Sequence, residues 1–291
     1  MAIPKLTRFF KIVFFDILNL MKVAAQVLLI ILFVILFLVG LLAGTFKFQL
    51  LDYNFWQGTF EKHNVYQNLA AASKNSLESQ VGAGGGSKND ARVLTDLITS
   101  ANVKDFVDKN LQNILSFVNG KTPQIIVYLP VKIIPRSLLP NNLIGIQSDI
   151  PLKDLLTKFN YQNYQSLPLQ SLGRLGRLTA LVFMGSVSLL VVIMILLVFL
   201  VRDGDRFVAP GIAVFLSGVI TLFLSGVGGR LEVVPPGSLP GNSSFIKILA
   251  GNLIPPLLTE LMKTWSVVGI VFVATGLVLF FVRRSRYNTK R

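Results

Sequence analysis

Four stretches of this chain contain no charged residue and no histidine. Each has about 17 to 24 residues, which is enough for a helix to cross the roughly 30 Å hydrocarbon core of a bilayer. Hydrophobic residues make up 52% of the 291-residue chain. We therefore predict a multi-pass α-helical membrane protein. Its four transmembrane helices are expected over residues 23–46, 178–201, 207–228 and 266–282.

Basic residues beside these spans predict the orientation, because Lys and Arg near span ends tend to remain cytoplasmic. Residues 1–22 carry four basic side chains against the single acid Asp16, and residues 283–291 carry five with no acid. We therefore expect a cytoplasmic amphipathic segment at the N-terminus and a basic cytoplasmic tail at the C-terminus. Residues 47–177 and 229–265 are then expected outside the cytoplasm.

The first uncharged stretch is longer than the apolar core of a secretory signal, which has about 7–15 residues. Lys47 follows it without a convincing cleavage site, so we interpret it as a retained signal anchor. Upstream, apolar residues recur every three or four positions between Lys5 and Lys22. This pattern indicates a helix lying in the membrane interface, with a docking surface for a cytoplasmic partner as the alternative.

The formal net charge is +14 and the chain has no cysteine. Many of the basic residues lie beside the membrane, where anionic lipids attract them, so we expect membrane lipid and no nucleic acid as a partner. Binding of an anionic envelope polymer by residues 47–177 is a weaker alternative. The lack of cysteine in a chain with large exported segments favours a bacterial plasma membrane. The glycosylation sequon at Asn242 is too short to outweigh this argument.

Residues 47–177 are numerous enough to form a domain with its own core. An apolar stripe predicts a helix over Val103–Val118, with Asn102 as its N-cap and Gly120 as its stop. We predict a mainly helical (α+β) exported domain inserted between transmembrane helices 1 and 2. Its other elements are expected to be helices at 93–98 and 64–80, a strand at 125–129 and a short helix from near Pro151.

No residue pattern typical of catalysis, metal binding or cofactor binding stands out in the sequence. His63 is the single histidine and is expected in an ordinary surface or turn position. The glycine-rich segment 82–88 lacks the spacing of a phosphate loop and predicts a flexible linker. Asp105 and Asp108 share a helix face with lysine neighbours, which indicates a solvated surface. We therefore predict a non-enzymatic protein with no cofactor and no metal.

A group of aromatic residues follows the first span directly. Rings at this position are typical of the belt at the membrane interface. The alternative is a partner surface, because clustered rings offer much apolar area with few rotatable bonds. The group consists of Tyr53, Phe55, Trp56 and Phe60.

Small residues occupy every fourth position of the third span. This spacing predicts a smooth ridge for close helix packing, within the bundle or between protomers in a homo-oligomer. A pore lined by small hydroxyl groups is the alternative. The ridge consists of Ala209, Ala213, Ser217, Thr221, Ser225 and Gly229, and Gly40 and Gly44 in the first span are its candidate counterpart.

The connections after the second span are short or rich in proline. Residues 202–206 are so few that spans two and three are expected to form an antiparallel hairpin. In the outer loop 229–265, Pro255 and Pro256 predict a short interfacial helix, a break and then a long final helix.

The order of one span, a large exported domain, a tight hairpin, a smaller outer loop and a final span resembles the topology of cell-division and macrolide-export permeases. That resemblance implies a membrane subunit of a transport or force-transmitting complex driven by a cytoplasmic ATPase. The uncharged spans argue against an ion-coupled transporter. From the residues we expect a scaffold, assembly partner or sensor of the cell envelope. An apolar cavity between the spans would favour the complex-subunit alternative.

Overall fold

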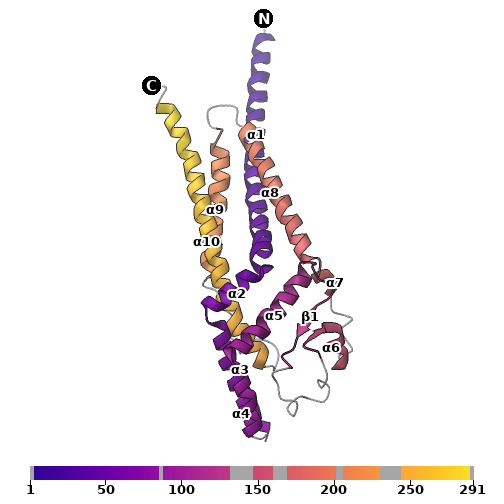
Figure 1. The fold of residues 1–291 in the computed structure, drawn as a ribbon. Helices are drawn as coiled ribbons and strands as arrows, with labels where there is room; N and C mark the ends of the chain where they lie inside the picture. The colour runs from indigo at the N-terminus through magenta and orange to yellow at the C-terminus, as the bar shows by residue number, and fades with distance from the viewer. Residues whose placement is uncertain are drawn as a thin grey trace. The chain divides into compact units, whose positions relative to one another are not determined.

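The computed structural model describes residues 3–84, 88–131, 147–159, 169–200, 206–229 and 244–288. These residues form helices and one small sheet, and the chain divides into two compact units (Figure 1). Unit 1 contains Met1–Ala43, Leu181–Gly228 and Met262–Arg291. Unit 2 contains Gly44–Ala180 and Gly229–Leu261.

Four helices of the described chain are long and apolar enough to cross a membrane, which confirms the predicted multi-pass helical membrane protein. The first and last of these segments each extend over 31 residues and so are longer than predicted. The segments are Leu20–Leu50, Leu175–Leu200, Val208–Gly228 and Gly251–Phe281. They belong to helix α1 (Ile3–Thr45) with the π-helical turn η1 (Phe46–Leu50), and to helices α8 (Leu175–Leu200), α9 (Val208–Gly228) and α10 (Ser244–Asn288).

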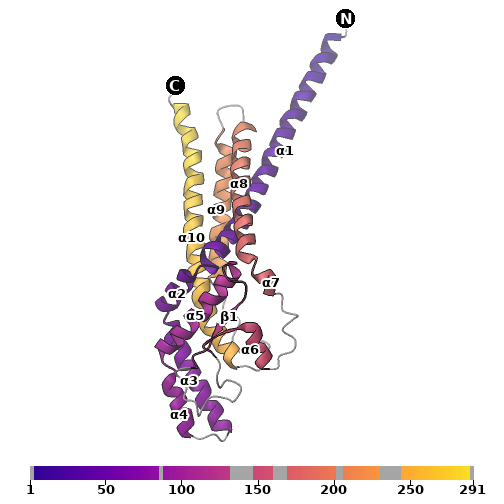
Figure 2. The ribbon, with the colours of Figure 1, turned by 45° about the vertical axis from the view of Figure 1, so that its right-hand side comes forward.

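Unit 1 is a bundle of these helices, in which α9 and α10 lie side by side (Figure 1, Figure 2) and α8 shares a buried core with α9. Aromatic side chains of α1 reach α10, since the rings of Phe37 and Phe272 lie 4.3 Å apart between centroids. Helices α8 and α9 adjoin each other as the predicted hairpin requires, although residues 201–205 of their connection lie outside the described residues. The buried core of the bundle consists of Phe33, Phe37, Ile193, Leu197, Ala209, Ala213 and Val214.

Helix α10 is continuous through Pro255 and Pro256, so the predicted break is wrong. Each proline removes a backbone donor and normally kinks or ends a helix. Here Leu253 and Leu257, which flank the proline pair, both pack with the core of unit 2. The hydroxyl of Thr259 also donates to the Pro255 carbonyl at 2.9 Å. Tertiary packing therefore overrides the local helix-breaking tendency.

Unit 2 is built from short helices around a small core, with one two-stranded antiparallel sheet in which Val127 lies opposite Ile150. Its core residues are Phe60, Val65, Tyr66, Leu69 and Leu257. Its helices are α2 (Tyr53–Lys62), α3 (Val65–Gly84), α4 (Lys88–Leu97), α5 (Ser100–Val118), α6 (Leu152–Lys158) and α7 (Leu169–Leu172), and its strands are β1 (Ile126–Tyr128) and β2 (Asp149–Pro151).

The two ends of helix α5 differ in how well the sequence predicted them. Gly120 ends the helix with a φ of 72°, as predicted, and the amide of Lys121 closes a Schellman motif on the Ser116 carbonyl. The predicted N-cap is wrong, because the Thr99 hydroxyl accepts the Asn102 amide at 3.1 Å and so starts the helix earlier. The Asn102 side chain donates instead to the Leu97 carbonyl at 2.7 Å.

The glycine-rich segment differs in part from the predicted linker. Residues 82–84 form the last turn of α3, whereas residues 85–87 lie outside the described residues. The sequon at Asn242 also lies outside them. The strand and the helix predicted after Gly120 are present as β1 and α6.

Candidate functional site: an apolar groove between the spans

The small residues of α9 lie on a buried face of the helix, with one exception. Ala213, Ser217 and Thr221 have no exposed surface, whereas Gly229 lies beyond the end of α9 and is exposed. The hydroxyl groups of Ser217 and Thr221 donate to carbonyls one turn earlier, each at 2.8 Å. Both groups are therefore satisfied within their own helix, which suits helix packing better than a polar pore.

The candidate counterpart Gly40 packs against α8 and not against α9. A Cβ atom added at Gly40 would meet only Ser186 within 4 Å, at 3.2 Å from its Cβ. Gly44 is half-buried near the end of α1. The expected pairing with the α9 ridge is therefore wrong at Gly40, whereas the pairing expected at Gly44 stays a prediction.

The close partner of α9 is α10, through glycines that the sequence analysis missed. A Cβ added at Gly218 would lie 2.8 Å from the Gly269 carbonyl, and one added at Gly211 would lie 3.4 Å from the Gly276 carbonyl. Ser225 continues this seam, since its hydroxyl lies 3.0 Å from the Ser266 hydroxyl. Small residues lie seven positions apart at Gly211, Gly218 and Ser225 of α9 and at Gly269 and Gly276 of α10, which is the spacing of a left-handed helix pair. That repeat was the signal that could have identified the pair.

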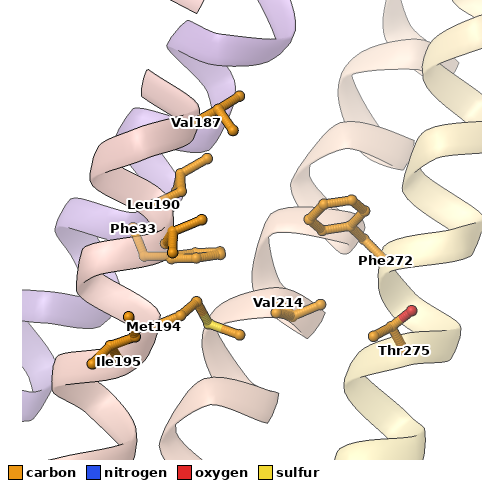
Figure 3. Close-up of a pocket in the computed structure, with 9 residues that line it drawn as sticks. Phe33, Val187, Leu190, Met194, Ile195, Val214, Phe272 and Thr275 are labelled. Atoms are coloured by element: carbon orange, nitrogen blue, oxygen red, sulfur yellow. The ribbon is translucent and has the colours of Figure 1, made fainter. Parts of the chain in front are cut away.

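An apolar groove of about 350 Å³ lies in unit 1 (Figure 3). Side chains of α1 and α8 face those of α9 and α10 across it. Phe33 and Val214 are almost fully buried beside it, whereas Val191 and Ile195 are about half exposed. The groove is lined by Phe33, Val187, Leu190, Val191, Met194, Ile195, Val214, Phe272 and Thr275.

The lining offers a polar ligand one hydroxyl group and no charged or amide side chain. Thr275 contributes its one hydroxyl group, which donates to the Val271 carbonyl within α10 at 2.8 Å. The other lining side chains are hydrocarbon or, at Met194, a thioether. The groove is therefore suited to hydrocarbon and unsuited to water or polar substrates.

The aromatic group after the first span forms part of the core of unit 2. The Phe60 ring is buried and packs edge-to-face against Trp56 and Tyr66, each at 5.7 Å between centroids. The Trp56 indole donates to the Leu50 carbonyl at 2.8 Å. Phe60 is thus not available to a partner, because α3 folds back on α2 and covers it, while Tyr53, Phe55 and Trp56 are only half-buried.

A network of polar side chains joins α2, α3 and α5 beside this core. The Tyr66 hydroxyl donates to the Asp108 carboxylate, and Lys104 pairs with Glu61 while lying 5.5 Å from the Tyr66 ring centroid. Burial, and then the bond to Asp108, raise the pKa of Tyr66. The hydrogen bond to Glu61 is the main cause that raises the pKa of Lys104. Asp108 therefore connects α5 to α3 through Tyr66, so the expectation that it is an ordinary solvated carboxylate is wrong.

The other two residues singled out in the sequence, Asp105 and His63, each contact a charged side chain. Asp105 pairs with Lys109 at 2.9 Å on the exposed face of α5, as predicted. His63 lies in the turn after α2, and its Nε2 is 3.0 Å from the Glu260 carboxylate. Lys62 contacts the same carboxylate at 2.9 Å. Within the described residues, no group of three or more His, Cys, Asp or Glu side chains could hold a metal ion.

Comparison with known proteins adds no functional assignment to this geometry. No family model matches the chain. No similar protein of curated function and no similar solved structure was found either.

Replacing Tyr66 with phenylalanine is expected to lower the free energy of unfolding by about 1.5–3 kcal/mol near neutral pH, because a hydrogen bond to a charged group is lost. The raised pKa of Tyr66 makes this contribution fully present below pH about 10, where a tyrosine in the unfolded chain ionises. It is lost as the pH rises toward the folded-state pKa. Thermal unfolding in mild detergent at pH 8 and pH 11 measures both effects.

The phenylalanine variant lacks the ionisable group, so its stability should fall less steeply between the two pH values than that of the unchanged protein. A second variant, Asp108→Asn, tests whether the hydrogen bond is responsible. The double variant should lower the free energy of unfolding by less than the sum of the decreases caused by the two single variants. Additive effects, or parallel pH profiles, would contradict the assigned bond.

Proposed function

We propose that this protein is a non-enzymatic membrane component of the bacterial cell envelope. It would present unit 2 outside the cytoplasm as a scaffold, assembly partner or sensor. The four helices able to span a membrane support the membrane location, and the basic chain ends support cytoplasmic termini. The separate core of unit 2, which is formed by helical residues, and its one two-stranded sheet support a mainly helical (α+β) presented domain.

The observation that carries this proposal is the participation of α10 in both units. Leu253 and Leu257 pack with the core of unit 2, whereas Phe272 packs with the core of unit 1. The two sets belong to one helix without a break. A partner that changes the packing of unit 2 around Leu257 therefore acts on the same helix that crosses the membrane. This connection suits a sensor or an assembly subunit.

The second candidate is a membrane subunit of a transport or force-transmitting complex. The apolar groove in unit 1 favours it, because a cavity among spans can hold part of a lipophilic substrate. Such a cavity is the feature that the sequence led us to expect of this alternative.

Purification of the full-length protein in mild detergent, at low and high salt, distinguishes the two candidates. Mass spectrometry would identify the proteins and lipids that remain bound. Envelope proteins held through unit 2 would support the scaffold, and recurrent copurification of an ATPase would overturn it in favour of the complex subunit. Bound proteins should be compared between the unchanged chain and a Glu260→Gln variant, which removes the negative charge that Lys62 and His63 contact.

Labelling of single cysteines tests the proposed placement of unit 2, since the chain has no cysteine of its own. In intact cells a membrane-impermeant maleimide should label Gln67→Cys, at an exposed position of α3. It should label Lys290→Cys only after the membrane is opened. Reversed labelling of the two variants would show that the orientation is wrong.

A further inference from the structure

The groove in unit 1 is open to the surroundings along α8, and buried side chains close its base. Val187, Val191 and Ile195 are 40%, 55% and 50% exposed and recur every fourth residue, so they form one edge along α8. Beneath them, Phe33 and Val214 are 3% and 5% exposed. Eight residues of helix rise about 12 Å, so the groove is long and runs parallel to α8 (Figure 3).

The surroundings of the groove determine what can enter it. Phe33, Val191 and Phe272 each lie well inside a segment able to cross a membrane, so the open edge faces bilayer hydrocarbon when these helices are inserted. Water would need two to four polar partners, which the lining does not offer. A polar headgroup would lose its hydrogen bonds to water without replacement. The occupant must therefore be a hydrocarbon.

The size and direction of the groove select one kind of hydrocarbon. A cavity of about 150 Å³ already holds a benzene ring, so 350 Å³ accommodates a longer chain. A lipid chain runs roughly parallel to membrane-spanning helices, as this groove does. A helix from a second copy is about 10–12 Å wide with its side chains and needs far more space than this groove provides.

We propose that the groove binds one acyl chain of a bilayer lipid, which lies along α8 against Phe33, Met194 and Phe272. The lipid headgroup remains outside the groove, so the site recognises the chain by shape and not by charge. Such a bound chain fills the gap between the α1–α8 side and the α9–α10 side of the bundle and stabilises unit 1. This inference does not depend on either proposed function.

Photocrosslinking of the full-length protein in lipid nanodiscs tests this proposal. The probe is phosphatidylcholine with a diazirine in the middle of one acyl chain, and mass spectrometry locates the labelled residues. We expect labels on Met194 and Phe272 in excess over Phe223 and Phe281, which are 69% and 61% exposed. Labelling that instead follows exposure over all apolar faces would overturn a specific site.

Two neighbouring valines of α8 provide a matched pair of variants. Val191→Phe places a ring at the groove edge, whereas Val192→Phe makes the same change at a 50% exposed position outside the lining. The first should reduce labelling of Met194 about tenfold, as expected when two methylene groups of the chain lose their burial. The second should leave it unchanged. Equal labelling of the two variants would overturn the proposal.

Both positions are exposed, so neither substitution requires repacking of the bundle, and thermal unfolding confirms that each variant is folded. A Val191→Cys variant tests the competing occupant. If oxidation of this otherwise cysteine-free chain in nanodiscs produced covalent dimers, the groove would face a second copy, and the lipid proposal would be wrong. Monomers under these conditions, together with specific lipid labelling, support the acyl chain.

Discussion

The Gly218→Ala variant is expected to unfold at a clearly lower temperature than the unchanged protein in mild detergent. An added Cβ would lie 2.6 Å from the Val273 backbone nitrogen and 2.8 Å from the Gly269 carbonyl oxygen. Both atoms belong to the α10 backbone, which cannot rotate away as a flexible side chain could. Overpacking of this kind costs about 3 kcal/mol. Helices α9 and α10 would have to separate along their seam.

Gly226 provides a control on the same helix. No atom lies within 4 Å of a Cβ added there, and the position is exposed. Gly226→Ala should therefore leave stability unchanged or raise it by up to about 1 kcal/mol through helix propensity. Gly276→Ala should reproduce the loss, because its Cβ would meet the Phe215 backbone nitrogen at 2.7 Å. Similar unfolding temperatures for Gly218→Ala and Gly226→Ala would show that α9 and α10 are not closely packed at Gly218.

The second large effect is expected for Phe60→Ala in unit 2. The Phe60 side chain is 2% exposed and contacts the rings of Trp56 and Tyr66. Truncating a buried phenylalanine removes its burial and leaves a cavity, at a cost of about 3–5 kcal/mol. Because unit 2 has a small core, this loss should expose its helices to proteolysis. Limited proteolysis of the full-length protein, with mass spectrometry of the fragments, should show earlier cleavage within residues 53–118.

Phe159 is the matched control, because it is a phenylalanine of the same unit that is 51% exposed. Phe159→Ala should change protease resistance only slightly. Phe60→Leu should give an intermediate result, since it keeps part of the buried volume. If Phe60→Ala resisted proteolysis as well as Phe159→Ala does, the aromatic cluster would not be the centre of this core.

The sequence alone was sufficient to predict the spans and several local features. In lipid every backbone polar group needs an internal partner, so a long uncharged stretch must be helical, whatever its neighbours are. The stop of α5 at Gly120 was equally local, because glycine adopts a positive φ at little cost. The strand at 126–128 and the helix after Pro151 also followed from short-range patterns.

Other features depended on residues far apart in the chain. The continuity of α10 through Pro255 and Pro256 depends on Leu253 and Leu257 packing with a core built largely from residues 60–69. The burial of Phe60 depends on the turn that brings Tyr66 over it. Local propensity favoured a break in the helix at the two prolines. It gave no information on whether Phe60 is buried.

The choice of helix partners and the groove were decided only by the tertiary structure. Lipid is as apolar as the helix surfaces, so hydrophobicity cannot select which spans meet, and shape complementarity must do so. The spacing of small residues on α9 predicted a packing face, but only the fold shows that Gly269 and Gly276 of α10 meet that helix. The groove needs Phe33, Val214 and Phe272 from three separate helices, and no pattern within one helix encodes their meeting.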